Sequence, residues 1–205
     1  MQRIAKMGHE IACHGLVHER TPDCAVQFRA QARTARAILQ DITGQPVLGY
    51  RAPHFSIEAA ALWKLLILKE EGYAYDSSMG STEWQTAQRT EEYATATDLP
   101  MEIPVYELPG GRKPRRVGGG HLAALSPWAF TRIRRALDAS ADPKVIYMHP
   151  YNLGGNRISP GNRVSSLIKM RHLYVHNLLA PFFRARVQAL LAGHRWQPLG
   201  DIAGV

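Results

Sequence analysis

Cysteine is scarce in this chain, with only Cys13 and Cys24 among its 205 residues. Two cysteines do not make the disulfide framework that holds small secreted domains together. Cys13 lies in an apolar stretch, and we expect it to be a small buried side chain. A chain of this length is long enough to bury a hydrophobic core instead.

Long apolar runs and a secretory signal are also lacking. No segment approaches the apolar length that crosses a bilayer, so we expect no stable membrane insertion and, for the chain as written, a cytoplasmic protein. Residues 1–8 resemble the last turn of a helix that ends at Gly8 and runs directly into a strand. A start in mid-helix predicts that an earlier part of the protein has been lost.

Acidic residues are outnumbered, with 17 Asp and Glu against 25 Lys and Arg and a formal net charge of +8. This excess permits an anionic partner such as an acidic glycan. The basic residues are dispersed, however, and no basic block alternates with aromatic residues as in nucleic-acid modules. We therefore interpret the charge as solvated surface and expect no nucleic-acid partner, while the oligomeric state is left open.

The remaining pattern alternates strands with helices. Strands are expected at 9–13, 47–50, 73–75, 102–108, 145–148 and 196–202, helices at about 21–43, 57–71, 126–139 and 166–192, and a loop at 79–100. The run at 145–148 is apolar throughout, which is typical of a strand buried on both faces. Gly118 and Gly119 permit a close backbone approach. The alternation predicts an α/β fold with a parallel sheet or barrel.

Polar side chains gather where these strands end: His14 and His18, Arg51, Asp76 and His149. Working residues of parallel α/β folds occupy this edge, so we expect one shared site. The H-x-x-x-H pair His14 and His18 supplies two imidazole ligands for a zinc-like cation, although a site needs a third. Alternatives stay open, because nine histidines give close pairs by chance, Asp76 can cap a turn, and His149 can be a core residue.

These segments together resemble the polysaccharide deacetylase family, also called carbohydrate esterase family 4 or the nodulation-factor deacetylase-like domain. The matching motifs, in the family's order, are H-x-x-x-H at 14–18, R-x-P at 51–53, D-S-S at 76–78 and a strand-end histidine at 149. The sequence segments GHEI, TGQPVLGYRAP, YDSS and YMHP are most similar to the exosortase-associated branch of the family, which accompanies exopolysaccharide gene clusters. The resemblance covers nearly the whole chain.

The resemblance implies a distorted, incomplete (β/α) barrel over 1–205, with about 1–150 as the barrel and 151–205 as a C-terminal helix and final strand. It implies removal of N-acetyl groups from amino sugars of a polysaccharide, with a divalent metal, usually zinc. His14 and His18 would be the metal ligands and His149 the general acid. Arg51 would orient a catalytic carboxylate, and Asp76 would support the site. Tyr151, Pro53 and Trp84 are candidates for sugar contacts, whereas His54 is expected to be solvated or structural.

One family motif has no counterpart. The family's first strand ends in paired acids that supply the general base and the aspartate ligand, and residues 1–13 hold no such pair, since Glu10 lies within a strand and points away from its end. A late-assigned start, a truncated remnant, or acids supplied by another chain would each explain the departure. Low activity is expected for the chain as written. A non-catalytic glycan-binding protein of the same fold, or hydrolysis of a smaller amide, are the alternative functions.

Overall fold

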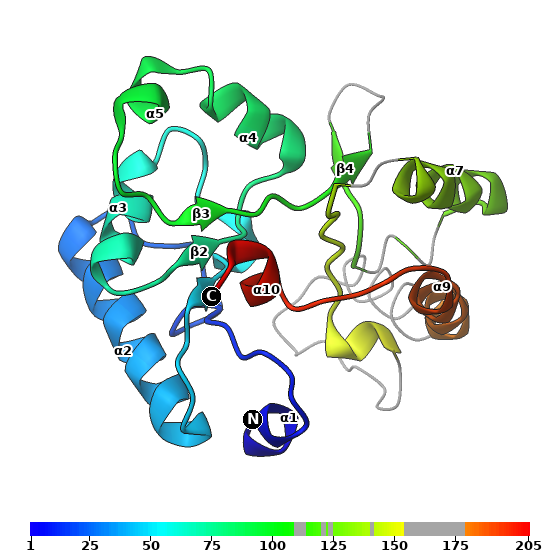
Figure 1. The fold of residues 1–205 in the computed structure, drawn as a ribbon, viewed down its shortest axis with the longest axis horizontal. Helices are drawn as coiled ribbons and strands as arrows, with labels where there is room; N and C mark the ends of the chain where they lie inside the picture. Colours follow the sequence, from blue (N-terminus) through cyan, green and yellow to red (C-terminus); the bar gives the residue numbers. More distant parts are fainter. Residues whose placement is uncertain (109–113, 120–121, 123–124, 140–141, 154–178) are drawn as a thin grey trace, which may run out of the picture. The chain divides into compact units, whose positions relative to one another are not determined.

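The computed structural model describes residues 1–108, 114–119, 122, 125–139, 142–153 and 179–205 (Figure 1). The chain divides into two compact units. The first consists of Met1–Val105 together with Gln197–Val205, and the second consists of Tyr106–Trp196.

A three-stranded parallel sheet forms the centre of the first unit. Its strands lie in the order β1 (Gly49–Tyr50), β2 (Tyr75–Asp76) and β3 (Met101–Glu102). A single parallel bridge from Cys13 to Tyr50 continues this arrangement on the far side of β1. Parallel neighbours connected through helices confirm the predicted mixed α/β class.

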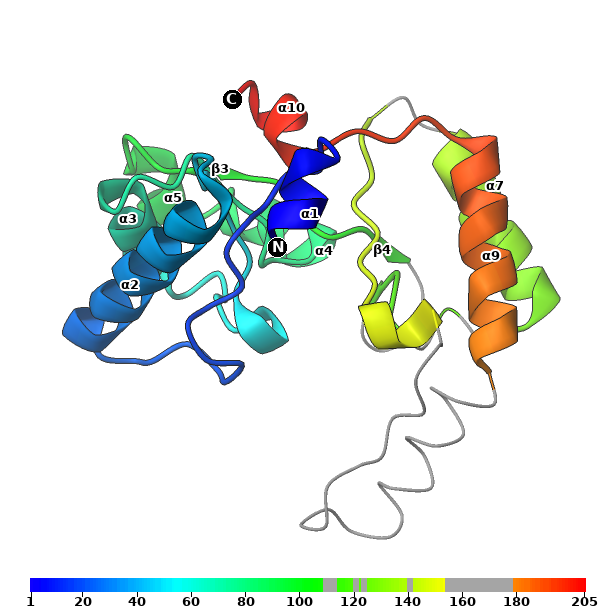
Figure 2. The ribbon, with the colours of Figure 1, turned by 90° about the horizontal axis from the view of Figure 1, so that it is seen from below.

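Two helices cover this sheet and lie side by side (Figures 1 and 2). α2 (Ala25–Thr43) buries Phe28, Ala32 and Ala35, which recur at helical spacing as the sequence predicts. Gly44 ends α2 in the left-handed conformation that glycine adopts without strain. α3 (Leu62–Glu70) buries Leu65 and Leu68 against the same core, which also contains Cys13.

The remaining elements of the first unit are short helices: α1 (Gln2–Lys6), η1 (Pro53–Phe55), α4 (Ser81–Ala87), α5 (Glu91–Thr95) and α10 (Leu199–Ala203). α10 comes from the C-terminal end of the chain, and the N–H of Gly200 within it donates to the Glu10 carboxylate at 2.9 Å. The other Glu10 oxygen accepts from the Tyr75 hydroxyl at 2.5 Å, so Glu10 connects α10 to β2.

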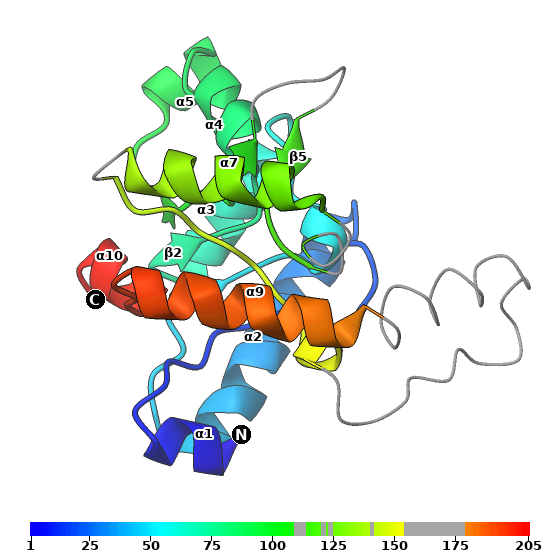
Figure 3. The same ribbon diagram turned by 90° about the vertical axis from the view of Figure 1, so that its right-hand side faces the viewer.

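The second unit has a core of its own. Its strands β4 (Glu107–Leu108) and β5 (Arg115–Arg116) are antiparallel, and η2 (Pro150–Leu153) lies further along the chain. α7 (Pro127–Asp138) and α9 (Ala180–Gly193) lie side by side and bury a shared apolar face made of Ile133, Leu137, Phe183, Val187 and Leu190 (Figures 2 and 3). The Ser126 hydroxyl caps α7 by accepting from the Ala129 N–H, so the predicted start of this helix is confirmed.

Several predicted elements are corrected by the structure. The segment 79–100, expected to be a loop, contains α4 and α5, which are too short to show periodicity. The last nine residues contain the helix α10 in place of a strand at 196–202, because Pro198 precedes its first turn and Gly204 ends it in the left-handed conformation.

Three strand predictions are also revised. The segment expected as a strand at 9–13 makes only a bridge, from Cys13 to Tyr50. The single strand expected at 102–108 is two strands, since β3 ends at Glu102 and β4 begins at Glu107. The segment 145–148 forms isolated bridges at Val145 and Tyr147 in place of a continuous strand, and Met148 is 38% exposed, so this run is not buried on both faces. Of the helix expected at 166–192, only the part from Ala180 onward lies within the described residues.

Candidate functional site

The loop after Cys13 carries the first pair of candidate residues, His14 and His18. The His14 Nδ1 lies 2.7 Å from the carbonyl oxygen of Arg51. A carbonyl oxygen only accepts, so Nδ1 carries the proton and donates, which assigns the tautomer and orients the ring. Gly15 has φ +82, and a Cβ there would lie 2.9 Å from the Pro53 Cγ, so this glycine is required for the close approach of the two loops.

A third histidine lies beside this pair. The rings of His14 and His18 are 5.2 Å apart with an interplanar angle of 65°, and the rings of His18 and His54 are 4.8 Å apart at 70°. His54 and Phe55 have φ values of 55° and 53°, which non-glycine residues rarely adopt and which cluster at functional sites. His54 is exposed, as the sequence predicts for a solvated residue, but its position beside His18 was not predicted, because it depends on a left-handed backbone that the sequence does not reveal.

Buried hydrogen bonds hold the two histidine-bearing loops together. The Thr21 N–H donates to the Ser56 Oγ at 2.9 Å, and the Thr21 hydroxyl donates to the Ser56 carbonyl oxygen at 3.1 Å. The ammonium group of Lys64, a buried residue of α3, donates to the Thr21 Oγ1 and to the Asp23 carboxylate, both at 3.1 Å. The relative position of His18 and His54 is therefore fixed by a connection that is itself shielded from water.

Arg51 follows β1 and binds the end of β2. Its Nε donates to the Ser77 carbonyl oxygen at 2.9 Å and its Nη2 to the Ser77 Oγ at 2.7 Å. The Ser78 hydroxyl donates to Asp76 at 2.8 Å and accepts from the Ala52 N–H at 2.8 Å. Asp76 is thus connected to the loop of Arg51 through Ser78, with its carboxylate fully buried.

The predicted site residues of the first unit lie on connected loops at one edge of the sheet. His14, Arg51, Pro53 and Asp76 all follow or end strands that run in the same direction. Trp84, on α4, is half-buried and packs its ring edge-to-face on Tyr93 at 5.6 Å.

His149 and Tyr151 belong to the second unit. The His149 N–H donates to the Asn152 Oδ1 at 3.1 Å, and the His149 ring contacts Tyr147 edge-to-face at 5.8 Å. Tyr151 lies within η2. The roles predicted for these two residues, and for those of the first unit, remain predictions.

His14 and His18 are of a residue type that binds metal ions, but two ligands are fewer than a metal site needs. A ligating histidine usually donates its second ring N–H to a carbonyl or carboxylate, as His14 donates to Arg51. Within the described ranges, however, no three His, Cys, Asp or Glu side chains are grouped so that they hold an ion. The site as described is therefore a partial one.

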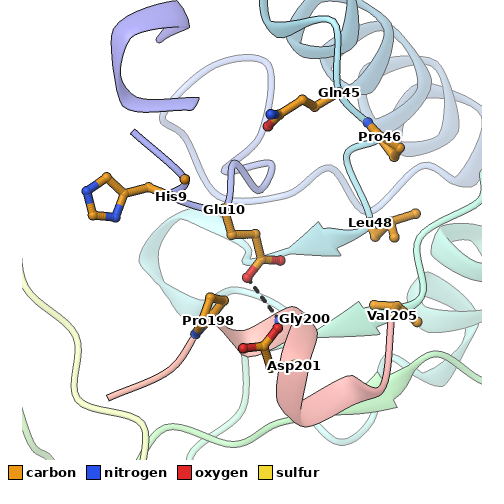
Figure 4. A pocket seen from close by; sticks show the side chains of 10 residues that line it. His9, Glu10, Gln45, Pro46, Leu48, Pro198, Gly200, Asp201 and Val205 are labelled. Atoms are coloured by element: carbon orange, nitrogen blue, oxygen red, sulfur yellow. Dashed lines mark hydrogen bonds between the residues drawn. The ribbon is translucent and has the colours of Figure 1, made fainter. Parts of the chain in front are cut away.

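A pocket of about 420 Å³ opens at the other edge of the same unit (Figure 4). Its lining includes Glu10 and Leu48, which precede strand positions instead of following them, and Gly200 of α10. Figure 4 shows the Glu10 carboxylate directed at the Gly200 backbone. The Glu10 carboxylate therefore makes its hydrogen bonds away from the histidine loop, as the sequence predicts.

Comparisons with known proteins point in one direction. Residues 1–75 match the family model described as polysaccharide deacetylase. YheN of Bacillus subtilis (strain 168), provisionally named a polysaccharide deacetylase, is 29% identical over 108 residues, which are 50% of this chain and 36% of YheN. A crystal structure from Mycobacterium smegmatis, provisionally described in the same way, superimposes with a TM-score of 0.56 at 19% identity and covers 99% of this chain and 64% of that one.

These findings support the predicted resemblance at the level of a polysaccharide deacetylase domain. The likeness to the solved structure shows the fold alone, and this fold is mixed α/β. The chain spans about a third of the length of YheN and less than two thirds of the solved protein. Among the described helices, none is long and apolar enough to cross a membrane.

Proposed function

We propose that this chain is a polysaccharide deacetylase, or a part of one, that hydrolyses N-acetyl groups from the amino sugars of a polysaccharide. One observation carries the proposal. The stretch that matches the family model contains both His14 and Arg51, and a hydrogen bond of 2.7 Å joins the His14 ring to the Arg51 backbone. The exosortase-associated branch and an exopolysaccharide substrate are the finer form of this proposal.

His14 and His18 are the proposed ligands of a divalent ion, most simply zinc, together with a carboxylate that residues 1–13 do not supply. Such an ion polarises an amide carbonyl and activates water. The protein's own contribution at this point is to hold the His14 ring by its Nδ1 proton, so that Nε2 is directed away from Arg51.

The other proposed roles concern protons and orientation. His149 gives a proton to the departing amine as general acid. Arg51 orients the catalytic carboxylate by a charge-assisted hydrogen bond, and Asp76 supports the loop of Arg51 through Ser78. Pro53, Trp84 and Tyr151 are proposed to contact the sugar.

Release of acetate tests this function. The chain, alone and extended by any in-frame upstream coding sequence, is incubated with N-acetylated chito-oligosaccharides and zinc or cobalt. We expect chelator-sensitive release of acetate, strongest in the extended chain, and its loss in His18→Ala but not in the neighbouring control His9→Ala. If the extended chain contains an acidic strand end and still releases no acetate, the deacetylase proposal is wrong.

A second candidate is a non-catalytic glycan-binding protein of the same fold. The incomplete ligand set in the described part of the chain favours it. It predicts saturable binding of the same oligosaccharides that a chelator leaves unchanged. Binding that is abolished by chelation would contradict this alternative.

A further inference from the structure

Two carboxyl groups are buried next to each other at the edge of the sheet that carries the candidate site. The parallel register of β2 and β3 pairs Asp76 with Glu102. Paired residues of neighbouring strands direct their side chains to the same face, so the two carboxyl groups share one environment. The exposed fraction is 0% for Asp76 and 5% for Glu102.

Three of the four carboxyl oxygens have a hydrogen-bond donor. Asp76 Oδ1 accepts from the Ser78 hydroxyl at 2.8 Å, and Oδ2 accepts from the Ser78 N–H at 3.0 Å. Glu102 Oε1 accepts from the Met79 N–H at 2.9 Å. For Glu102 Oε2, which is buried, the described residues provide no donor. A buried oxygen without a donor is costly if it is charged, but not if it carries a proton of its own.

Electrostatics decides which group keeps a proton. Burial raises the pKa of Asp76 and raises that of Glu102 well above its ordinary value, and the charge of Asp76 raises the Glu102 pKa further. The interaction with Glu102 acts on Asp76 in the opposite direction and lowers its pKa. Two carboxylates that share a buried site do not both ionise, and the oxygen without a donor belongs to Glu102, whereas both Asp76 oxygens have donors, so Glu102 is the acid and Asp76 the carboxylate.

We propose that Glu102 is a neutral carboxylic acid at neutral pH, that its Oε2–H donates to Asp76, and that it is a positioning residue of the candidate site. The pair then carries one negative charge, which faces the Arg51 guanidinium. Among the described residues, the phenols of Tyr50, Tyr75 and Tyr93 also face the pair, and burial keeps them neutral by raising their pKa.

The pair is connected to the candidate site by two short routes. One runs from Asp76 through the Ser78 hydroxyl to the Ala52 N–H, directly after Arg51. The other runs from Ile103, the residue after Glu102, whose carbonyl accepts from the Ser77 hydroxyl at 2.6 Å, and from there to Arg51. The positioning role rests on the proposed function, whereas the protonation of Glu102 is tested without any activity.

The sign of the pH effect follows from the raised pKa. The folded chain keeps a proton that an unfolded glutamate releases above about pH 4.5. The stabilisation is complete below that value and is lost as the pH rises toward the folded-state pKa. In Glu102→Gln the amide N–H replaces the acid proton as a permanent donor, so this loss disappears.

The experiment compares the full chain with Glu102→Gln in urea unfolding between about pH 5.5 and 7.5. Relative to the variant, we expect the wild-type unfolding equilibrium constant to rise about tenfold per pH unit, the change for one proton. The exposed Glu92→Gln serves as the control and is expected to keep the wild-type slope. Equal slopes for the wild type and Glu102→Gln would overturn the proposal.

A direct measurement covers the case in which Glu102→Gln does not fold. Carboxyl carbon chemical shifts of the ¹³C-labelled wild-type chain report each protonation state separately. A Glu102 carbon with the shift of a protonated acid at about pH 7 supports the proposal, and one with the shift of a carboxylate overturns it. Neither result depends on acetate release, so failure of the deacetylase proposal would leave this one standing.

Discussion

Arg51 holds two loops of the first unit with one planar group, because its Nε and Nη2 donate to two different oxygens of Ser77. A lysine ammonium does not reproduce this two-pronged geometry. We predict that Arg51→Lys lowers the free energy of unfolding by about 1–3 kcal/mol, measured by urea denaturation. Arg20→Lys is the control, since the Arg20–Glu58 pair is 64% and 61% exposed, and a loss below about 1 kcal/mol is expected. Equal losses of unfolding free energy in the two variants would show that the Arg51–Ser77 hydrogen bonds contribute no more than an exposed ion pair.

The stability of the second unit also depends on a single residue, Gly118. A Cβ at this position would lie 2.0 Å from the Tyr147 carbonyl oxygen, and its φ of +145 suits only glycine. Gly118→Ala is therefore expected to cost at least about 2 kcal/mol of stability by thermal unfolding. Gly193→Ala, in a helix of the same unit with its nearest neighbour at 4.0 Å, should be neutral or slightly stabilising. A neutral Gly118→Ala would contradict the close approach.

At the scale of residues, the sequence correctly predicted features that a residue's place in a strand or a glycine indicates directly. The buried Cys13, the close approach at Gly118 and the orientation of Glu10 are confirmed. Glu102 was not recognised, because a carboxylate in an alternating segment resembles an ordinary strand residue. Only the register of β3 against β2 brings it next to Asp76.

Helix α3 and the two histidine-bearing loops form a connected element through Thr21. Valine has the shape of threonine but lacks the hydroxyl that accepts from Lys64. We predict that Thr21→Val lowers stability by about 1–3 kcal/mol and speeds amide hydrogen exchange in residues 54–57. Thr95→Val, at the exposed end of α5, is the matched control and should change stability by less than about 0.5 kcal/mol. Unchanged exchange in Thr21→Val would mean that the loops hold without this connection.

At the scale of elements, length decides what the sequence predicts. α2 and α7 have 19 and 12 residues, enough for several repeats of the apolar face and for a capping residue. α4, α5 and α10 have 7, 5 and 5 residues, so no period is established and they were missed. The paired strands are only two residues long, and their ends depend on neighbours distant in sequence.

At the scale of the whole molecule, the alternation of strands and helices was sufficient to predict the parallel α/β class. The division into two units was less visible, because the boundary between Val105 and Tyr106 falls inside one predicted strand. The return of Gln197–Val205 to the first unit brings the Gly200 N–H to the Glu10 carboxylate, and nothing in the local sequence of α10 indicates that contact.

Removal of residues 197–205 tests how much this return contributes. The deletion leaves the Tyr75–Glu10 hydrogen bond in place but takes away the Gly200 N–H and uncovers part of the pocket beside Leu48. We predict a lower urea midpoint for the shortened chain and faster amide exchange in β2. Asp201→Asn, an exposed change within α10, should keep the full-length midpoint. An unchanged midpoint in the deletion would show that α10 is dispensable for the first unit.

The return of the C-terminal segment also has a consequence during synthesis. Residues 1–105 leave the ribosome long before α10 exists, and the whole second unit is made in between. Until residues 197–205 emerge, the Glu10 carboxylate lacks the Gly200 N–H and keeps the Tyr75 hydroxyl as its donor among the described contacts, so the first unit is incomplete. The first unit is therefore completed only after the second unit has been synthesised, although it begins first.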